Sequence, residues 1–315
     1  MHVKATYDRA ISLVICTRNR ANALRGCLDA LSALQYDPGA WELVIVNNAS
    51  TDRTDEVLQA FARQVPFRVT IVHEPKPGLS CARNAGVRGS RGPIIAFTDD
   101  DCYVAPDFLT RIVDVFRESQ YGYIGGRVLL HDPSDARETI KEDTQAADIA
   151  PYSCVQPGFI HGANMAFRRE VWDAVGGFDP LLGSGTRFIA DDVDFLGRVS
   201  AAGWPGAYRP EPVVRHHHGR KPGPDVAKLR SAYARGRGAY YIKGCLDRRM
   251  RPQFARHWYW NLRLLAKQRR FPEAATELAA GAEYVMRSLL QPRQVPWPLL
   301  KQRDEPPAPR PAGMG

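Results

Sequence analysis

Short apolar runs alternate with helical segments over the first hundred residues, and this order constrains the fold most strongly. Residues 11–16, 41–48, 67–73 and 93–97 are rich in β-branched residues and are expected as strands. Between them, residues 21–34, 52–64 and 79–90 repeat apolar side chains at helical spacing. Because the order strand–helix–strand gives right-handed crossovers, the sequence predicts an α/β fold. Its sheet should be mostly parallel and doubly wound, with ligands at the carboxyl ends of the strands.

The pattern changes after residue 120. Residues 121–130, 158–169 and 207–218 are expected as strands, and residues 169–178 and 191–203 as short helices. We therefore predict a main domain at residues 1–220, followed by a basic helical C-terminal extension at residues 221–300. Residues 301–315 are rich in proline and are expected to form a disordered tail.

The charge balance favours an anionic partner. The chain has 43 Lys and Arg against 34 Asp and Glu, which gives a net charge of +9. Nucleotide phosphates, an anionic membrane surface and nucleic acid are all compatible with this charge.

The six cysteines lack CxxC spacing, so neither a zinc site nor a disulfide framework is indicated. With no apolar leader and no run of about 18 apolar residues, the chain is expected to be cytoplasmic and not to span a membrane.

Three consecutive aspartates, Asp99, Asp100 and Asp101, follow the fourth expected strand. Neighbouring carboxylates repel one another and resist desolvation, so they are tolerated on a solvated loop or around a cation. At the carboxyl end of a parallel sheet, a divalent cation such as Mn²⁺ or Mg²⁺ could bridge them to the phosphates of a nucleotide. The alternative is a solvated acidic turn that caps a helix beginning near Pro106.

Five co-linear segments resemble the successive blocks of family 2 glycosyltransferases, which have the GT-A fold of nucleotide-diphospho-sugar transferases. They are SLVICTRNRANALRGCLDAL, ELVIVNNASTDRTDEVL, KPGLSCARNAGVRGSRGPIIAFTDDDC, GANMAFRREVWDAVGGFDPLLGSG and ADDVDFLGRVSAAGW. The resemblance covers residues 10 to about 220. It implies an inverting, metal-dependent hexosyltransferase. Such an enzyme moves a sugar from a nucleoside-diphosphate sugar, commonly UDP-linked, to a hydroxyl of a glycan, polysaccharide or lipid-linked acceptor.

On the donor side, the resemblance implies a DXD motif. Asp99 and Asp101 match its outer positions, which hold the metal and the donor's ribose and diphosphate, and Asp100 fills the middle. Thr17 and Arg18 follow the first strand, where the family begins its nucleotide pocket.

Two further donor-side blocks leave alternatives open. Asn47, Asn48 and Asp52 match a block usually written VDNxSxD, which contacts the base. Asn47 replaces the leading Asp: its amide oxygen can still accept a hydrogen bond from uracil, but the lost charge leaves the identity of the base open. The pair could also be a simple turn. Arg83 matches a position beside the diphosphate, where a bidentate contact is possible, or lies in solvent on a capped amphipathic helix.

On the acceptor side, Asp191 and Asp192 match the family's acidic pair at the start of a helix. Asp192 occupies the place of the general base, with Asp191 next in line, although the pair could simply cap the helix. Gly162 and Asn164 match a strand bordering donor sugar and acceptor, or belong to a plain core strand. His216, or His218, could complete the metal's ligands, and a nitrogen ligand would favour Mn²⁺; the alternative is a surface histidine cluster.

Residues 251–270 combine Arg and Lys with Trp258, Tyr259 and Trp260. This composition suits the cytoplasmic face of an anionic membrane, and equally helices that pack back on the main domain. A competing function is a non-catalytic nucleotide-sugar-binding protein of the same fold, but both acidic sites are present. Nucleic acid is not an expected partner because it would explain none of the five blocks.

Overall fold

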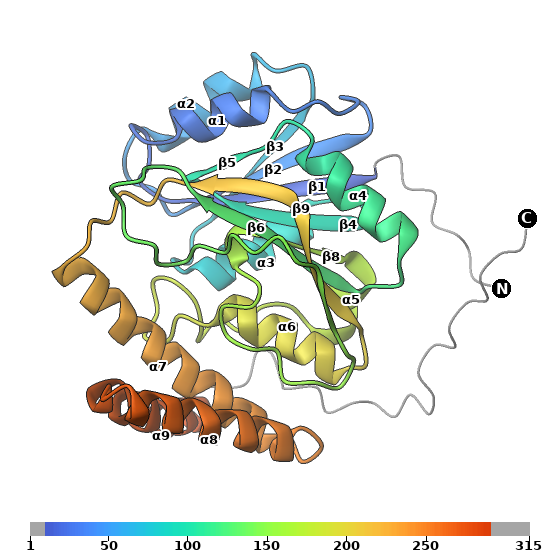
Figure 1. The fold of residues 1–315 in the computed structure, drawn as a ribbon. Coiled ribbons are helices and arrows are strands. Elements are labelled where there is room, and N and C mark those ends of the chain that lie inside the picture. Colours follow the sequence, from blue (N-terminus) through green and yellow to red (C-terminus); the bar gives the residue numbers. More distant parts are fainter. Residues whose placement is uncertain (1–9, 291–315) are drawn as a thin grey trace, which may run out of the picture.

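A computed structural model describes residues 10–290. Nine strands within this range form one sheet, with helices on both faces (Figure 1). The strands are β1 (Ile11–Thr17), β2 (Trp41–Asn48), β3 (Arg68–Glu74), β4 (Ile94–Asp99), β5 (Cys102–Val104), β6 (Tyr123–Leu130), β7 (Ala147–Ile149), β8 (Met165–Arg168) and β9 (Gly206–His216). The helices are α1 (Arg25–Ser32), α2 (Thr54–Ala62), α3 (Leu79–Gly89), α4 (Phe108–Glu118), α5 (Arg169–Val175), α6 (Asp191–Ala201), α7 (Pro224–Leu246), α8 (Arg251–Lys267) and α9 (Phe271–Leu290).

The strand order confirms the α/β class. The sheet runs β3-β2-β1-β4-β8-β6-β9-β5, and β7 pairs with β9. Strands β1 to β4 are mutually parallel. Strands β6 and β9 share their direction, because β8 is antiparallel to both β4 and β6, and β9 is parallel to β6. The sheet is therefore mostly parallel, and the carboxyl ends of β1, β2 and β4 meet at one edge.

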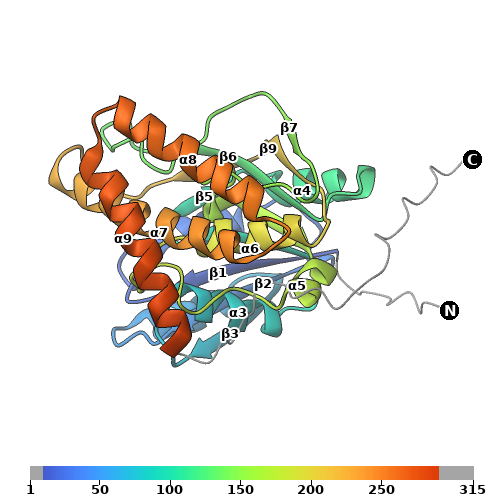
Figure 2. The same cartoon turned by 90° about the horizontal axis from the view of Figure 1, so that it is seen from below.

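Strand alternation produces a hydrophobic core on each face of the sheet. In β1, Leu13 and Ile15 pack toward α1, α2 and α4, whereas Val14 packs toward α3, α5 and α6. The second core continues into the helical extension, since Tyr240 of α7 and Phe254 of α8 are fully buried in it. Figure 2 shows α7, α8 and α9 stacked over this face, beyond α6. The layer of α3, α5 and α6 and the helical extension thus share one core.

The local structure differs from the sequence analysis at three points. Residues 158–169 do not form one strand: Gly162–Asn164 is a 3-10 turn, and only Met165–Arg168 is β8. The turn forms because the Asn164 side chain bonds backbone carbonyls of neighbouring strands. The three aspartates do not cap a helix near Pro106, because β5 intervenes and α4 begins at Phe108. The short strands β5 and β7 were not predicted, since three residues are too few to show a period.

The chain's last predicted segments lie partly outside the described residues. Residues 221–300 were expected to be helical, and α7, α8 and α9 confirm this as far as Leu290. Residues 291–300 and the proline-rich segment 301–315 are outside the described range. Among the described helices, none combines the length and the apolar character needed to cross a membrane.

Candidate active site

One cavity brings together the two acidic groups that are about ninety positions apart in the sequence. Its volume is about 430 Å³, and it lies at the carboxyl ends of β1 and β4. All of the aspartates of both groups line it: Asp99, Asp100, Asp101, Asp191 and Asp192. We call this space the acidic cavity.

The aspartate triplet is not a freely solvated turn. Asp99 ends β4 beside Cys16 of β1, and the three carboxylates are only partly exposed. Arg20 lies between two of them, with its Nε 3.5 Å from Asp100 Oδ1 and its Nη2 3.6 Å from Asp101 Oδ2. Burial raises the pKa of Asp100 to about 6, against the opposing effects of Thr17 and Arg20. So much buried negative charge favours a bound cation.

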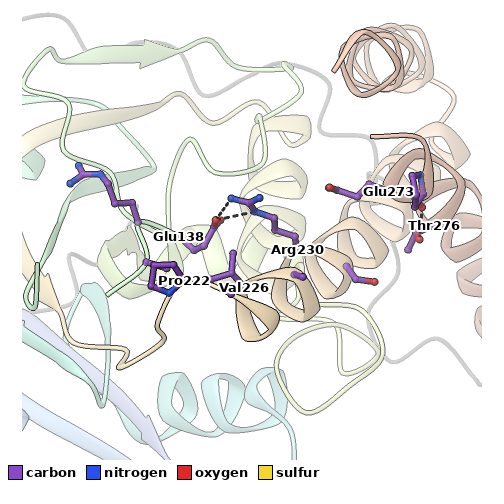
Figure 3. A pocket seen from close by; sticks show the side chains of 12 residues that line it. Glu138, Pro222, Val226, Arg230, Glu273 and Thr276 are labelled. Carbon is purple, nitrogen blue, oxygen red and sulfur yellow. Dashed lines mark hydrogen bonds and ion pairs between the residues drawn. The ribbon is translucent and has the colours of Figure 1, made fainter. Parts of the chain in front are cut away.

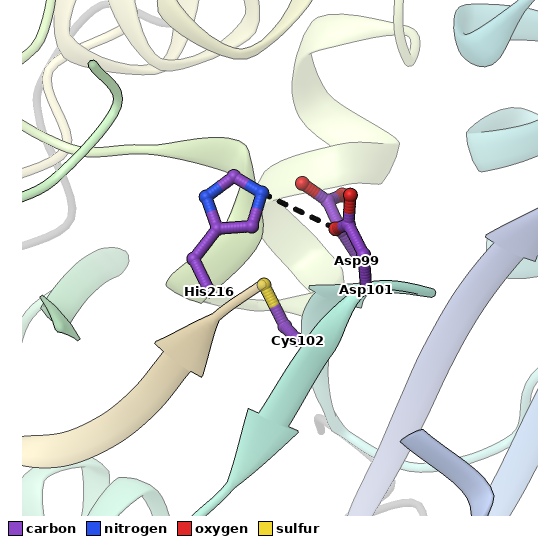
Figure 4. Close-up of side chains that lie close together, drawn as sticks. All are labelled: Asp99, Asp101, Cys102 and His216. Carbon is purple, nitrogen blue, oxygen red and sulfur yellow. Dashed lines mark ion pairs between the residues drawn. The ribbon is translucent and has the colours of Figure 1, made fainter. Parts of the chain in front are cut away.

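Side chains with the chemistry of a metal site gather around the triplet (Figure 4). Potential ligand atoms of Asp99, Asp101, Cys102 and His216 all lie within 4.8 Å of one another. Strand pairing causes this, because β5 places Cys102 opposite His216 of β9. His216 Nε2 lies 3.2 Å from Asp101 Oδ1.

This donor set fits a divalent cation. Two carboxylates and one imidazole suit Mn²⁺ or Mg²⁺. Burial raises the pKa of Cys102, so its neutral thiol is the weakest ligand of the four. Of the two histidines considered, His218 is not in this group: its ring centroid lies 5.1 Å from that of His216, but its Nε2 bonds the carbonyl of Ala136 at 2.9 Å. The geometry therefore selects His216.

Arg83 joins the two acidic groups from the inner wall of the cavity. It is only 3% exposed, so the alternative of an arginine in solvent is wrong. Its guanidinium forms a hydrogen-bonded ion pair with Asp191 and lies 3.7 Å from Asp99 Oδ1. The rings of Phe97 and Phe178, 5.6 and 5.7 Å away, confine it. Arg83 thus neutralises Asp191 and helps to hold Asp99.

Asp192 differs from Asp191 in its surroundings. It lies in the first turn of α6, where Oδ2 accepts the Gly162 N–H at 2.9 Å and Oδ1 accepts the Val193 N–H at 2.7 Å. No basic side chain among residues 10–290 forms an ion pair with it, in contrast to Asp191. Two backbone hydrogen bonds at the start of α6 therefore fix the orientation of this carboxylate.

Gly162 and Asn164 have different surroundings. Gly162 lines the acidic cavity, and a Cβ added there would come within 2.3 Å of Arg83 Nη2. Asn164 is 2% exposed and outside the cavity lining. Its amide donates to the carbonyls of Arg127 at 2.8 Å and Pro212 at 3.0 Å, which joins β6 to β9. These contacts favour a structural role for Asn164.

The expected base-contacting residues lie outside the lining of the acidic cavity. Asn48 is buried and braces the loop after β3: its Oδ1 accepts the N–H of Gly78 at 2.9 Å, and its Nδ2 donates to the carbonyls of Glu74 and Lys76. Asn47 Nδ2 lies 3.2 Å from Asp55 Oδ1. The charge that Asn47 lacks is therefore present next to it, on Asp55.

Asp52, Thr17 and Arg18, the other expected nucleotide-binding residues, also lie outside the lining of the acidic cavity. Asp52 accepts hydrogen bonds from both the N–H and the hydroxyl of Thr54, and from the N–H of Ala21 at 3.2 Å. Thr17 is buried at the end of β1, and Arg18 is exposed. The hydrogen bond from Ala21 to Asp52 thus joins the loop after β1 to the loop after β2.

Several lining residues escaped sequence reasoning. Arg20, which pairs with Asp100 and Asp101 but does not line the cavity, was missed as well; it is in the first matched segment, two positions after Arg18, and its charge was the available signal. The others reach the cavity only through the fold and have no local signature. They are Glu138, Thr139, His161, Arg220, Tyr233 and Arg237. Two of these, Tyr233 and Arg237, come from α7, so the helical extension contributes to the site.

A second cavity adjoins the first (Figure 3). It measures about 810 Å³ and is formed by the loop around Ala136, the start of α7 and the start of α9. Glu138 lines both cavities and receives two hydrogen bonds from Arg230, at 3.0 and 2.6 Å. Pro222, Val226 and Pro272 give this cavity a largely apolar wall.

The chain belongs to glycosyl transferase family 2, whose sequence profile matches residues 12–176, more than half of the chain. It is 27% identical over 194 residues to glycosyltransferase AglE of Haloferax volcanii, covering 62% of each chain. It is 25% identical over 206 residues to the succinoglycan biosynthesis protein ExoM of Rhizobium meliloti, covering 65% of each. The match thus spans less than two thirds of these relatives.

Solved structures of glycosyltransferases share the fold. Mannosyltransferase PcManGT from Pyrobaculum calidifontis, in complex with GDP-Man and Mn²⁺, superposes with a TM-score of 0.63 at 24% identity, over 90% of this chain and 79% of the other. TarS of S. aureus (residues 1–349) with UDP-GlcNAc gives a TM-score of 0.54 at 14% identity, over 88% and 81%. The GT-A fold is thereby confirmed.

Proposed function

We propose that the protein is a metal-dependent, inverting hexosyltransferase that uses a nucleoside-diphosphate sugar, with UDP as the nucleotide. One observation carries the proposal: a single cavity holds a carboxylate–histidine cluster and, separately, the unpaired carboxylate of Asp192. Transfer with inversion needs both features, a site for the leaving diphosphate and a base for the incoming hydroxyl.

Each residue has a defined part in this reaction. Asp99, Asp101 and His216 would hold Mn²⁺ or Mg²⁺, which when bound would neutralise charge on the diphosphate. Asp192 accepts the proton of the acceptor hydroxyl as its oxygen bonds to the anomeric carbon. The bond from that carbon to the diphosphate breaks, and the nucleoside diphosphate leaves with the electron pair. Arg83 and Arg20 keep the aspartates in place through the contacts described above.

The acceptor is a glycan, polysaccharide or lipid-linked sugar. The acceptor would reach the acidic cavity through the second cavity, because Glu138 lines both cavities. The donor's base is the least constrained element, since the solved neighbours named above are bound to GDP-Man in one case and to UDP-GlcNAc in another. The proximity of Asp55 to Asn47 supports a hydrogen-bonded base such as uracil at the end of β2.

Two substitutions test the proposal, read out by donor binding and by turnover. Asp192→Asn should abolish transfer and leave donor binding in the presence of Mn²⁺ unchanged. Asp101→Ala should abolish the metal-dependent part of donor binding, measured by thermal shift with nucleoside diphosphates and their sugars. Asp173→Asn, at an exposed position of α5, is the matched control.

The results of these experiments distinguish the two candidate bases, and an enzyme from a non-catalytic binding protein. Turnover retained in Asp192→Asn would reassign the base to Asp191. Donor binding by the wild type without transfer to any acceptor or to water would instead identify a non-catalytic nucleotide-sugar-binding protein.

A further inference from the structure

The outward side of α9 has an unusual composition. Every residue of Phe271–Leu290 that is exposed is apolar. These residues follow one another at helical spacing and make a continuous stripe: Phe271, Pro272, Ala275, Leu278, Ala279, Ala282, Met286, Leu289 and Leu290. A surface helix of a soluble protein normally shows the opposite pattern, with polar residues facing solvent.

The polar residues of α9 face the protein instead. Glu277 is fully buried and accepts hydrogen bonds from Arg237 of α7 and Asn261 of α8. Glu283 pairs with Arg187 and Arg235. The helix is therefore held in its orientation by the buried Glu277 and by the partly exposed ion pairs of Glu283, and the apolar stripe is fixed outward.

The neighbouring helix α8 adds a basic and aromatic strip. Its exposed residues include Arg256, Tyr259, Trp260, Arg263 and Lys267. Arg263 lies over the rings of Tyr259 and Trp260, at 5.8 and 5.2 Å. No acidic residue occurs in residues 251–270. The strip thus carries unbalanced positive charge.

We propose that this surface binds the interface of an anionic lipid bilayer. The docking face consists of the exposed apolar residues of α9 together with Arg256, Tyr259, Trp260, Arg263, Leu264 and Lys267 of α8. Figure 2 shows both helices on the same side of the molecule. Apolar side chains enter the acyl boundary, Tyr and Trp sit at the headgroup level, and Arg and Lys meet anionic headgroups. The unbalanced positive charge of α8 selects a bilayer over an apolar protein partner.

The docking face is continuous with the second cavity. Pro272 belongs to both, and Phe271 precedes it with 60% of its surface exposed. A lipid-linked acceptor could thus pass from the bilayer along the apolar wall of that cavity toward Glu138 and the acidic cavity. This step rests on the proposed function, whereas the docking itself does not.

Vesicle co-sedimentation of the full chain tests the docking. The probes are vesicles of phosphatidylcholine alone and of phosphatidylcholine mixed with phosphatidylglycerol. The wild type should bind the anionic vesicles, and added salt should weaken the binding. The triple variant R256Q/R263Q/K267Q should lose roughly a hundredfold in affinity. The variant L278S/M286S should also lose binding, because it removes inserted apolar surface.

The matched control is R63Q/R91Q/R117Q, three exposed arginines of the main domain outside the docking face. It should bind as the wild type does, and all variants should keep the wild-type melting temperature because the substituted side chains are exposed.

Failure of the wild type to bind anionic vesicles would overturn the proposal. Equal losses of vesicle binding in the control R63Q/R91Q/R117Q and in R256Q/R263Q/K267Q would also overturn it. A dimer that L278S/M286S converts to a monomer, with no vesicle binding, would assign the face to a second copy. Donor binding is measured in parallel, so a failure of docking is distinguishable from a failure of the proposed function.

Discussion

Among single residues, Gly162 has a steric role that a substitution can expose. A Cβ at this position would approach Arg83 Nη2 to 2.3 Å, and the rings of Phe97 and Phe178 confine the guanidinium. Gly162→Ala should therefore displace Arg83 from Asp191 and reduce turnover by at least about tenfold, since small misplacements of catalytic groups are costly. Initial rates at saturating donor measure the effect. Gly39→Ala, at an exposed turn, is the control, and wild-type turnover in Gly162→Ala would contradict the role.

The sequence alone identified the aspartates of the two acidic groups, but not the side chains that surround them in the structure. Asp99, Asp101, Asp191 and Asp192 lie in matched segments, and all of them line the acidic cavity. The burial of Arg83 against Asp191 could not be predicted, because it depends on α3 and α6 meeting in space. For the same reason no motif revealed Tyr233 or Arg237, which enter the site only through the packing of α7.

At the scale of elements, a buried ionic network fastens the extension to the main domain. Lys243 of α7 lies 2.7 Å from Asp179 and 2.8 Å from Asp194 of α6, and Arg198 also pairs with Asp194. Lys243→Met would leave buried carboxylates without their cation, so we expect a loss of about 3–5 kcal/mol in the free energy of unfolding. Chemical denaturation measures it. Lys228→Met, at an exposed position of the same helix, should change stability little.

The same network predicts a dependence of stability on pH. Burial would raise the pKa of Asp179, but Lys243 and the Tyr284 hydroxyl outweigh it and hold that pKa below 3.8. The folded state therefore binds this proton more weakly than the unfolded state does. The stabilisation is present above about pH 4 and is lost as the pH falls further. The stability difference between wild type and Asp179→Asn should shrink on acidification, and a constant difference between pH 7 and pH 3 would contradict the assignment.

Element prediction succeeded where periodicity was long enough. Strands β1 to β4 carry clear patterns, and the structure places them close to the expected residues. The turn at Gly162–Asn164 was missed because an apolar segment hides it, and only the two long-range hydrogen bonds of Asn164 reveal why the chain turns there. Strand β5 is short but decisive, since its pairing with β9 brings His216 to the aspartates.

For the whole molecule, the expected boundary at residue 220 should not separate two units that fold independently. Tyr240 and Phe254 are fully buried in the core beneath the sheet, and α7 supplies Tyr233 and Arg237 to the acidic cavity. In turn, α9 secures α7: a Cβ on Gly238 would meet the Glu277 carbonyl at 2.0 Å, so the two helices are in close backbone contact.

A chain ending after residue 221 should therefore expose this core and unfold, or melt well below the full chain, because several large apolar side chains lose their burial together. Differential scanning calorimetry of the two chains measures this directly. A chain ending after residue 290 is the control and should melt well above the chain ending after residue 221, since it keeps α7, α8 and α9. A truncation after residue 221 that melts cooperatively at the wild-type temperature would show that residues 1–220 form a domain on their own. In that case the extension would serve only the site and the docking face.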